Sequence, residues 1–284
     1  MAPAVANYAR YVRSDEQWQL ARFIVPAARL ADFEVAAMPF WNEHGTEHDN
    51  EWPISALVGE NIEADLTAIH AFNERHAAAQ RAQIDSIECK LSTPEDAARV
   101  AQLIPANIAA YLEFAELQPP ARNQFLDAIS AADATSKGTL RAKIRTGGVK
   151  AEMIPPPADV LGFIAACAER KLAFKATAGL HHAAAGSYPL TYEPNAACGS
   201  MHGFLNLFVA AGLLWHGLDA AQVTSVFTEQ DASGCLFTDI GLSWKGWSLT
   251  TEQIAEVRGN FAIAFGSCSF EEPLADLKSL GLVP

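Results

Sequence analysis

Two lysines inside short apolar runs are the residues of this sequence best suited to covalent chemistry. Lys143 lies in LRAKIRTGG at 140–148, and Lys175 lies in LAFKATAGLHH at 172–182. Burial and a neighbouring cation both disfavour the charged form of a lysine and so lower its pKa. The neutral amine can attack a carbonyl carbon and form a Schiff base. Lys175, with other cations nearby, is the stronger candidate to form the imine.

Charged side chains on the predicted strands supply proton transfer and substrate binding. Side chains alternate between the faces of a strand, so Lys143 shares a face with Arg145, and Glu88 shares one with Lys90. Buried charges are costly unless they pair or meet a ligand. We expect Glu88 or Glu113 to move protons and Arg145 to hold an anionic group. A purely structural network of ion pairs is the alternative interpretation.

Small residues follow the predicted strands. The turns at 146–148, 177–179 and 266–269 can present backbone N–H groups to a phosphate or carboxylate, or can be tight turns that need small residues. The anion interpretation, combined with the charges above, predicts a substrate-binding set. Its members are Lys90, Arg145, Gly147, Gly148, Thr177, His182, His202, Asn206 and Ser267.

Histidines give a competing interpretation of the same region. His181 and His182 follow the second lysine run, and His202 precedes Asn206 by about one helical turn. They could act as general acids or bases, or ligate a metal with an acidic residue. The sequence contains no HExxH or HxH pattern. We therefore expect His181 to assist proton transfer, with no metal and no other cofactor.

The composition favours a well-packed globular enzyme of a small anionic molecule. The chain has 284 residues, of which 50% are hydrophobic and 19% charged, and its formal net charge is −13. The low charge content excludes a disordered protein, and the negative balance argues against binding to nucleic acid or to an anionic membrane. The apolar run 203–215 fits a buried helix or a surface between copies of the chain, so a homo-oligomer stays open.

The cysteines and the chain start predict a cytoplasmic protein. The N-terminal residues lack the apolar segment of a signal peptide, and the run 203–215 is too short to span a bilayer. Cys268 is expected to be a small core residue, because the sequence offers it no evident base. An odd, scattered set of cysteines indicates reduced thiols; the five are Cys89, Cys167, Cys198, Cys235 and Cys268.

Strands and helices alternate along most of the chain, which is the pattern of a parallel α/β fold. A doubly wound nucleotide-binding sheet would show a glycine-rich first turn, and the residues after the first strand have none. Charged residues near several strand ends favour a (β/α)8 TIM-like barrel. The predicted strands are 22–27, 53–59, 85–91, 107–115, 140–148, 172–182 and 260–270. An eighth strand would lie in the N-terminal segment or in 183–200; otherwise the barrel is incomplete, or irregular in its last third.

Helix-start signals and one inserted hairpin complete this organisation. Thr93 before Pro94 predicts one N-cap, Thr250 with Gln253 and Ser269 with Glu272 predict capping boxes, and 157–170 has helical periodicity. Residues 235–248 predict a hairpin late in the chain. The polar loop 41–52 is long enough to cover a barrel mouth, and its His44 and His48 are expected to be solvated. No linker divides the chain, so we expect one domain, 1–284.

The segments FKATAGLHH and AKIRTGG resemble the lysine strands of deoxyribose-phosphate aldolase and its class I relatives. In that family one barrel strand carries the Schiff-base lysine, and the next carries a second lysine before a glycine turn. The resemblance implies that Lys143 or Lys175 forms the imine and that the other lowers its pKa; we expect Lys175 to form it and Lys143 to be the neighbour. It also implies a lyase of a small anionic carbonyl or phosphorylated metabolite that needs no cofactor. The family's acid partner is an aspartate, whereas this chain offers Glu88 or Glu113.

Three other functions fit the same residues. Lysines, arginines and acids in a barrel also resemble a phosphoribosyltransferase of the quinolinate type, in which cations hold a dicarboxylate and a diphosphate without an imine. Histidines with acids would suit a metal-dependent barrel enzyme. A barrel that binds a metabolite without turnover is the third alternative, because one fold supports many functions.

Overall fold

The computed structural model describes residues 1–42 and 51–283. Its main element is a seven-stranded sheet with the strand order β1–β2–β3–β4–β5–β6–β12, and paired strands run parallel. All seven predicted strands are confirmed. They are β1 (Phe23–Pro26), β2 (Trp52–Leu57), β3 (Ala82–Lys90), β4 (Ala109–Glu113), β5 (Thr139–Arg145), β6 (Phe174–Thr177) and β12 (Ala262–Gly266).

The fold is therefore α/β with a parallel sheet, and a complete (β/α)8 barrel is not what the structure contains. The two segments expected to supply an eighth strand do not join the sheet. The N-terminus forms a helix, and residues 183–200 contribute to a separate antiparallel pair, β7 (Gly186–Pro189) and β8 (Cys198–Met201). The seven-strand order is compatible with an incomplete TIM-like barrel.

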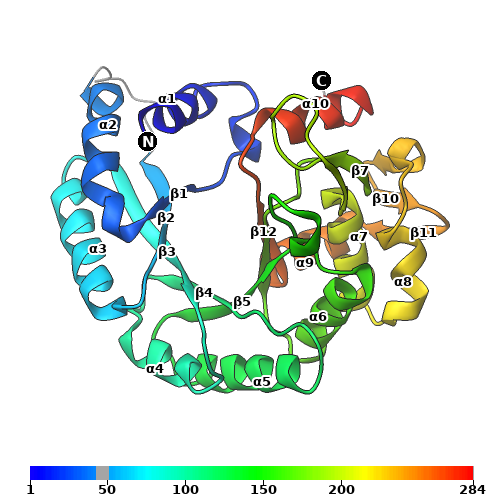
Figure 1. Cartoon of the computed structure of the whole chain (residues 1–284), viewed down its shortest axis with the longest axis horizontal. Coiled ribbons are helices and arrows are strands. Elements are labelled where there is room, and N and C mark those ends of the chain that lie inside the picture. The colour runs from blue at the N-terminus through cyan, green and yellow to red at the C-terminus, as the bar shows by residue number, and fades with distance from the viewer. Residues whose placement is uncertain (43–50, 284) are drawn as a thin grey trace. The chain divides into compact units, whose positions relative to one another are not determined.

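Contacts divide the chain into two compact units. The first comprises Met1–Leu112 and Ala131–Leu140. It holds β1, β2, β3 and most of β4. Helix α3 packs along β3, and both lie in the cyan part of Figure 1. Buried rings of Phe33 and Phe72 fill its core. Its helices are α1 (Ala2–Tyr11), α2 (Leu30–Asn42), α3 (Ile62–Ala77) and α4 (Asp96–Leu103).

The second unit comprises Glu113–Ser130 and Arg141–Pro284. It holds most of β5, with β6 and β12, and is centred on a mostly apolar helix, α7, that packs against α6 and α8 (Figure 1). The run 203–215 is therefore a buried core helix. The helices of this unit are most of α5 (Ala121–Asp133), α6 (Pro157–Glu169), α7 (Phe204–Trp215), α8 (Ala220–Phe227), α9 (Thr251–Asn260) and α10 (Glu271–Ser279). That the chain forms one domain stays a prediction.

The late hairpin is confirmed and is larger than predicted. Strands β9 (Leu236–Thr238), β10 (Gly241–Trp244) and β11 (Trp247–Thr250) form a three-stranded antiparallel sheet. Lys245 and Gly246 join the last two strands, and both have positive φ values, 52° and 82°. Two such residues form the type I′ turn that matches the twist of a hairpin.

Helix starts follow the predicted caps in part. Thr250 and Gln253 form the predicted capping box of α9. At α10 the Ser269 hydroxyl accepts from the Glu272 amide. The Thr93 cap is wrong, because the carboxylate of Asp96 accepts from the Ser92 and Thr93 amides and α4 begins at Asp96.

Two further findings concern the sequence predictions for membranes and loops. Among the described helices none is long and apolar enough to cross a bilayer. His44 and His48 lie outside the described residues, as does most of the loop predicted to cover a barrel mouth.

Candidate active site

Lys143 and Lys175 are direct neighbours on β5 and β6. The parallel register pairs these two residues, and only 8% of Lys143 and 6% of Lys175 is exposed. Residues in register on adjacent parallel strands point to the same face. Their flanking residues, Ala142, Ile144 and Ala176, are buried as well. The sequence therefore folds two amino groups onto one face of the sheet, in surroundings that are largely closed to water.

Glu113 joins this pair from the end of β4. Its Oε2 lies 2.6 Å from Nζ of Lys143, and the two side chains are 12% and 10% exposed. A charge-assisted contact of this length, with so little water, is stronger than an exposed ion pair. The structure thus brings together Lys143, Lys175 and Glu113, which we call the lysine cluster.

The turns after β5 and β6 pack against each other backbone to backbone. The Thr146 hydroxyl donates to the Ala178 carbonyl at 2.7 Å, and its amide donates to Thr177 at 2.8 Å. A Cβ built on Gly147 would lie 2.7 Å from Cα of Gly179. Gly147 is therefore needed for this close approach. The small residues here therefore form tight turns, which is the second of the two interpretations given for them in the sequence analysis.

The other predicted residues of these turns lie near the same strand ends. Arg145, at the exposed end of β5, donates from Nε to the Gly147 carbonyl at 3.0 Å. The Thr177 hydroxyl donates to the Ile144 carbonyl at 3.5 Å. Gly148 lies against Met153, to which a Cβ would come within 2.7 Å. These residues mainly support the two turns.

Glu88 and Lys90 belong to β3, in the first unit. Glu88 is buried, with 5% of its surface exposed, and Lys90 is exposed at the end of the strand. The predicted shared face therefore holds one buried acid and one solvated cation.

His202 and Asn206 are buried supports within the second unit. The Asn206 amide donates to the carbonyls of Val226 and Glu229 and accepts from the Ala185 amide. His202 contacts the Pro155 carbonyl through Nε2 at 2.9 Å, and burial lowers the pKa of its imidazole. Both polar side chains serve the packing of loops around α7.

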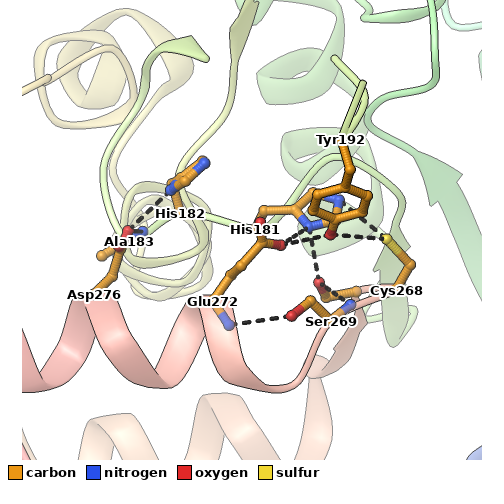
Figure 2. A network of polar contacts seen from close by, with 9 residues as sticks. His181, His182, Ala183, Tyr192, Cys268, Ser269, Glu272 and Asp276 are labelled. Atoms are coloured by element: carbon orange, nitrogen blue, oxygen red, sulfur yellow. Dashed lines mark hydrogen bonds and ion pairs between the residues drawn. The ribbon is translucent and has the colours of Figure 1, made fainter. Parts of the chain in front are cut away.

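A second polar cluster, the thiol cluster, lies after β6 and β12 (Figure 2). His181 follows β6, and its Nε2 lies 3.7 Å from Sγ of Cys268, which follows β12. Its Nδ1 lies 2.8 Å from Oε2 of Glu272 and 3.3 Å from the Ser267 hydroxyl. Tyr192 donates to the same Glu272 oxygen at 2.9 Å. Cys268 is exposed, so its expected place in the core is wrong.

Electrostatics within the thiol cluster favour a charged pair. The contact with His181 lowers the pKa of Cys268, although partial burial opposes it. The contacts with Cys268 and then Glu272 raise the pKa of His181 to about 8, against the opposing effect of burial. A lowered thiol pKa beside a histidine is typical of reactive cysteines.

His182 is held beside this cluster by the same helix. Its Nδ1 lies 3.2 Å from Asp276 Oδ2, which also accepts from the Ala183 amide at 2.9 Å. The Tyr188 ring stacks on the imidazole with 3.6 Å between ring centroids. Glu272 and Asp276 lie one turn apart on α10 and extend to the two consecutive histidines (Figure 2).

Sequence reasoning missed three members of the thiol cluster: Cys268, Tyr192 and Glu272. The capping pattern accounts for Glu272 in the sequence, and Cys268 lies 87 residues from its histidine. The structure supplies what the sequence lacks, because Gly266 of β12 is in register with Thr177 of β6. Residues shortly after those two positions must therefore lie close together.

All five cysteines are free, as predicted. Over residues 1–42 and 51–283, no group of three or more histidine, cysteine or acidic side chains is placed to hold a metal ion. Comparisons with protein-family models, with curated proteins and with solved structures find no match to this chain. Its resemblance to class I aldolases therefore rests on the two lysine segments alone.

Proposed function

We propose that this protein is an enzyme of small anionic carbonyl compounds and that Lys175 forms a Schiff base with the substrate. The observation that carries the proposal is the register of Lys175 beside Lys143, with both side chains buried and Glu113 in contact with Lys143. Catalytic groups at the carboxyl ends of parallel strands are the rule in TIM-like folds.

The chemistry assigns a separate role to each member of the lysine cluster. Burial and a neighbouring ammonium both disfavour a charged lysine. The neutral Lys175 amine attacks the carbonyl carbon, and loss of water from the carbinolamine gives the imine. Glu113, held by Lys143, takes and returns the protons of these steps. Arg145 is the exposed cation at the end of β5 that attracts the substrate's carboxylate or phosphate.

Borohydride trapping tests the proposal. The protein is incubated with small aldehydes, 2-oxoacids or sugar phosphates, reduced, and weighed as an intact chain. Reduction converts an imine to a stable secondary amine, so we expect one adduct, mapped to the peptide that contains Lys175. Lys175→Met should abolish it. Lys150→Met, which removes an exposed lysine from the loop after β5, is the matched control and should retain it.

Different results would favour the other functions. An adduct that persists in Lys175→Met would contradict the assignment of the imine to this residue. Binding of a dicarboxylate and a diphosphate, with activity that survives borohydride in the presence of substrate, would favour the phosphoribosyltransferase-like alternative. Activity lost on chelation would favour a metal-dependent enzyme.

A further inference from the structure

We propose that Cys268, His181 and Glu272 form a nucleophilic centre that accepts acyl groups from activated esters and thioesters. The three side chains are linked in the order that thiol-dependent acyl transfer requires: nucleophile, base and the group that orients the base. The inference goes beyond the imine chemistry and does not rest on the lysine cluster.

The geometry gives each nitrogen of His181 a different partner. Nδ1 faces the Glu272 carboxylate at 2.8 Å, so this nitrogen carries a proton. Nε2 faces the sulfur of Cys268 at 3.7 Å and is the nitrogen that can take the thiol proton. The spacing to sulfur is longer than in a tight hydrogen bond, and such contacts often tighten when substrate binds.

Glu272 is itself held in place. Tyr192 donates to Oε2 of Glu272. The backbone amide of Glu272 donates to the Ser269 hydroxyl at the start of α10 (Figure 2). Ser267 lies beside the same imidazole nitrogen and accepts from the Ser269 amide at 3.2 Å. The base is thereby oriented by a carboxylate that Tyr192 also contacts, which is the function of the third member of a triad.

The surroundings of the sulfur stabilise a thiolate. Cys268 lies two residues before Phe270, the N-cap of α10, where the helix dipole favours negative charge. The His181 imidazole faces the thiol at 3.7 Å and is the group that stabilises the thiolate. The Tyr192 hydroxyl lies at the same distance, but its proton is donated to the Glu272 carboxylate. The next acid on the helix, Asp276, contacts His182 instead.

The other cysteines of the chain provide the contrast. Burial raises the pKa of Cys89 and of Cys235 to about 11 and raises that of Cys167 further. Cys198 is exposed like Cys268, but it lies on β8, which pairs with β7 and not with the strands that precede His181 and Cys268. Cys198 is therefore the matched control for exposure without the triad.

The reaction balances with water as the only co-reactant. The Cys268 thiolate attacks the carbonyl carbon of the ester, a C–S bond forms, and the C–O bond to the leaving alcohol breaks. The alcohol takes the proton of the His181 imidazolium. His181 then takes a proton from water, whose oxygen attacks the thioester carbon, and the C–S bond breaks to release the carboxylic acid and the thiolate.

Alkylation of the native protein tests the thiolate without any mutation. Iodoacetamide is applied at about pH 6.5, where an ordinary thiol is almost fully protonated, and modification is followed by peptide mass. We expect Cys268 to react at least about tenfold faster than Cys198. Equal rates would overturn the proposal.

Acylation with p-nitrophenyl acetate tests the transfer step. We expect a burst of p-nitrophenolate and an acetyl group on the Cys268 peptide, both absent in Cys268→Ser and retained in Cys198→Ser. His181→Gln and Glu272→Gln, checked for native unfolding transitions, should slow acetylation by at least about tenfold. Fast alkylation with no acetyl-enzyme would contradict acyl transfer. Because the readout is acetyl on sulfur, its failure is separate from a failure of imine trapping on Lys175.

Discussion

One carboxylate oxygen of Glu113 lies 2.6 Å from the Lys143 ammonium, with both side chains about nine-tenths buried. Removing one partner of such a pair leaves the other charge in a poorly hydrated site. We predict that Glu113→Leu lowers the free energy of unfolding by about 3 kcal/mol. Urea denaturation followed by circular dichroism measures it.

The double variant Glu113→Leu/Lys143→Met is the control for that pair. It removes both charges, so we expect it to be more stable than Glu113→Leu alone. If the double variant loses as much free energy of unfolding as the two single variants together, Glu113 and Lys143 do not interact.

Gly147 should be intolerant of any side chain. The Cβ of Gly147→Ala would lie 2.7 Å from a backbone carbon of Gly179, which cannot move without separating the two turns. We predict a loss of about 2 kcal/mol or more in the free energy of unfolding. The matched control is Gly259→Ala in α9, where no atom lies within 4 Å of the added carbon. It should be neutral, or stabilise the protein by up to about 1 kcal/mol. Equal effects of the two changes on thermal unfolding would refute this account of the turns.

Asn206 should matter for stability rather than for substrate binding. Asn206→Leu leaves one amide and two carbonyls without their buried partner, and each such group costs roughly 1–3 kcal/mol. We predict a loss of about 3 kcal/mol or more, measured by urea denaturation. A stable variant with weakened ligand binding would restore the original prediction that Asn206 contacts substrate.

His202 should make the fold sensitive to mild acid. Burial lowers the pKa of His202 in the folded chain below the value of about 6.5 that it has when unfolded. Below that pH the unfolded chain binds a proton that the folded chain does not, so stability falls as the pH falls through this range. His202→Gln keeps a donor for the Pro155 carbonyl and lacks the titration. We therefore expect the melting temperature of the wild type to drop more between about pH 7.5 and 5.5 than that of the variant. If the melting temperatures of the wild type and of His202→Gln fall equally with pH, His202 does not make the fold acid-sensitive.

The strands were predictable because their signal is local. Each is a short apolar run bounded by a turn, and the runs that contain Lys143 and Lys175 stay recognisable despite their charges. The pairing of Cys268 with His181 was not predictable in this way. It depends on β12 joining β6 across the whole of the inserted segment, and strand adjacency of that range leaves no mark in either run. His202 and Asn206 show the opposite failure. Their spacing placed Asn206 in the first turn of α7, although the helix begins at Phe204 and His202 lies just before its N-cap. Periodicity does not say which buried polar groups are already satisfied.

The separation of these partners along the chain sets an order of events during synthesis. His181 leaves the ribosome 87 residues before Cys268, and the carboxylate that orients it follows on α10. At about 5–20 residues per second, the imidazole is made roughly 4–17 s before its thiol exists. A nascent chain therefore cannot display the activated cysteine until nearly all of the second unit has been translated.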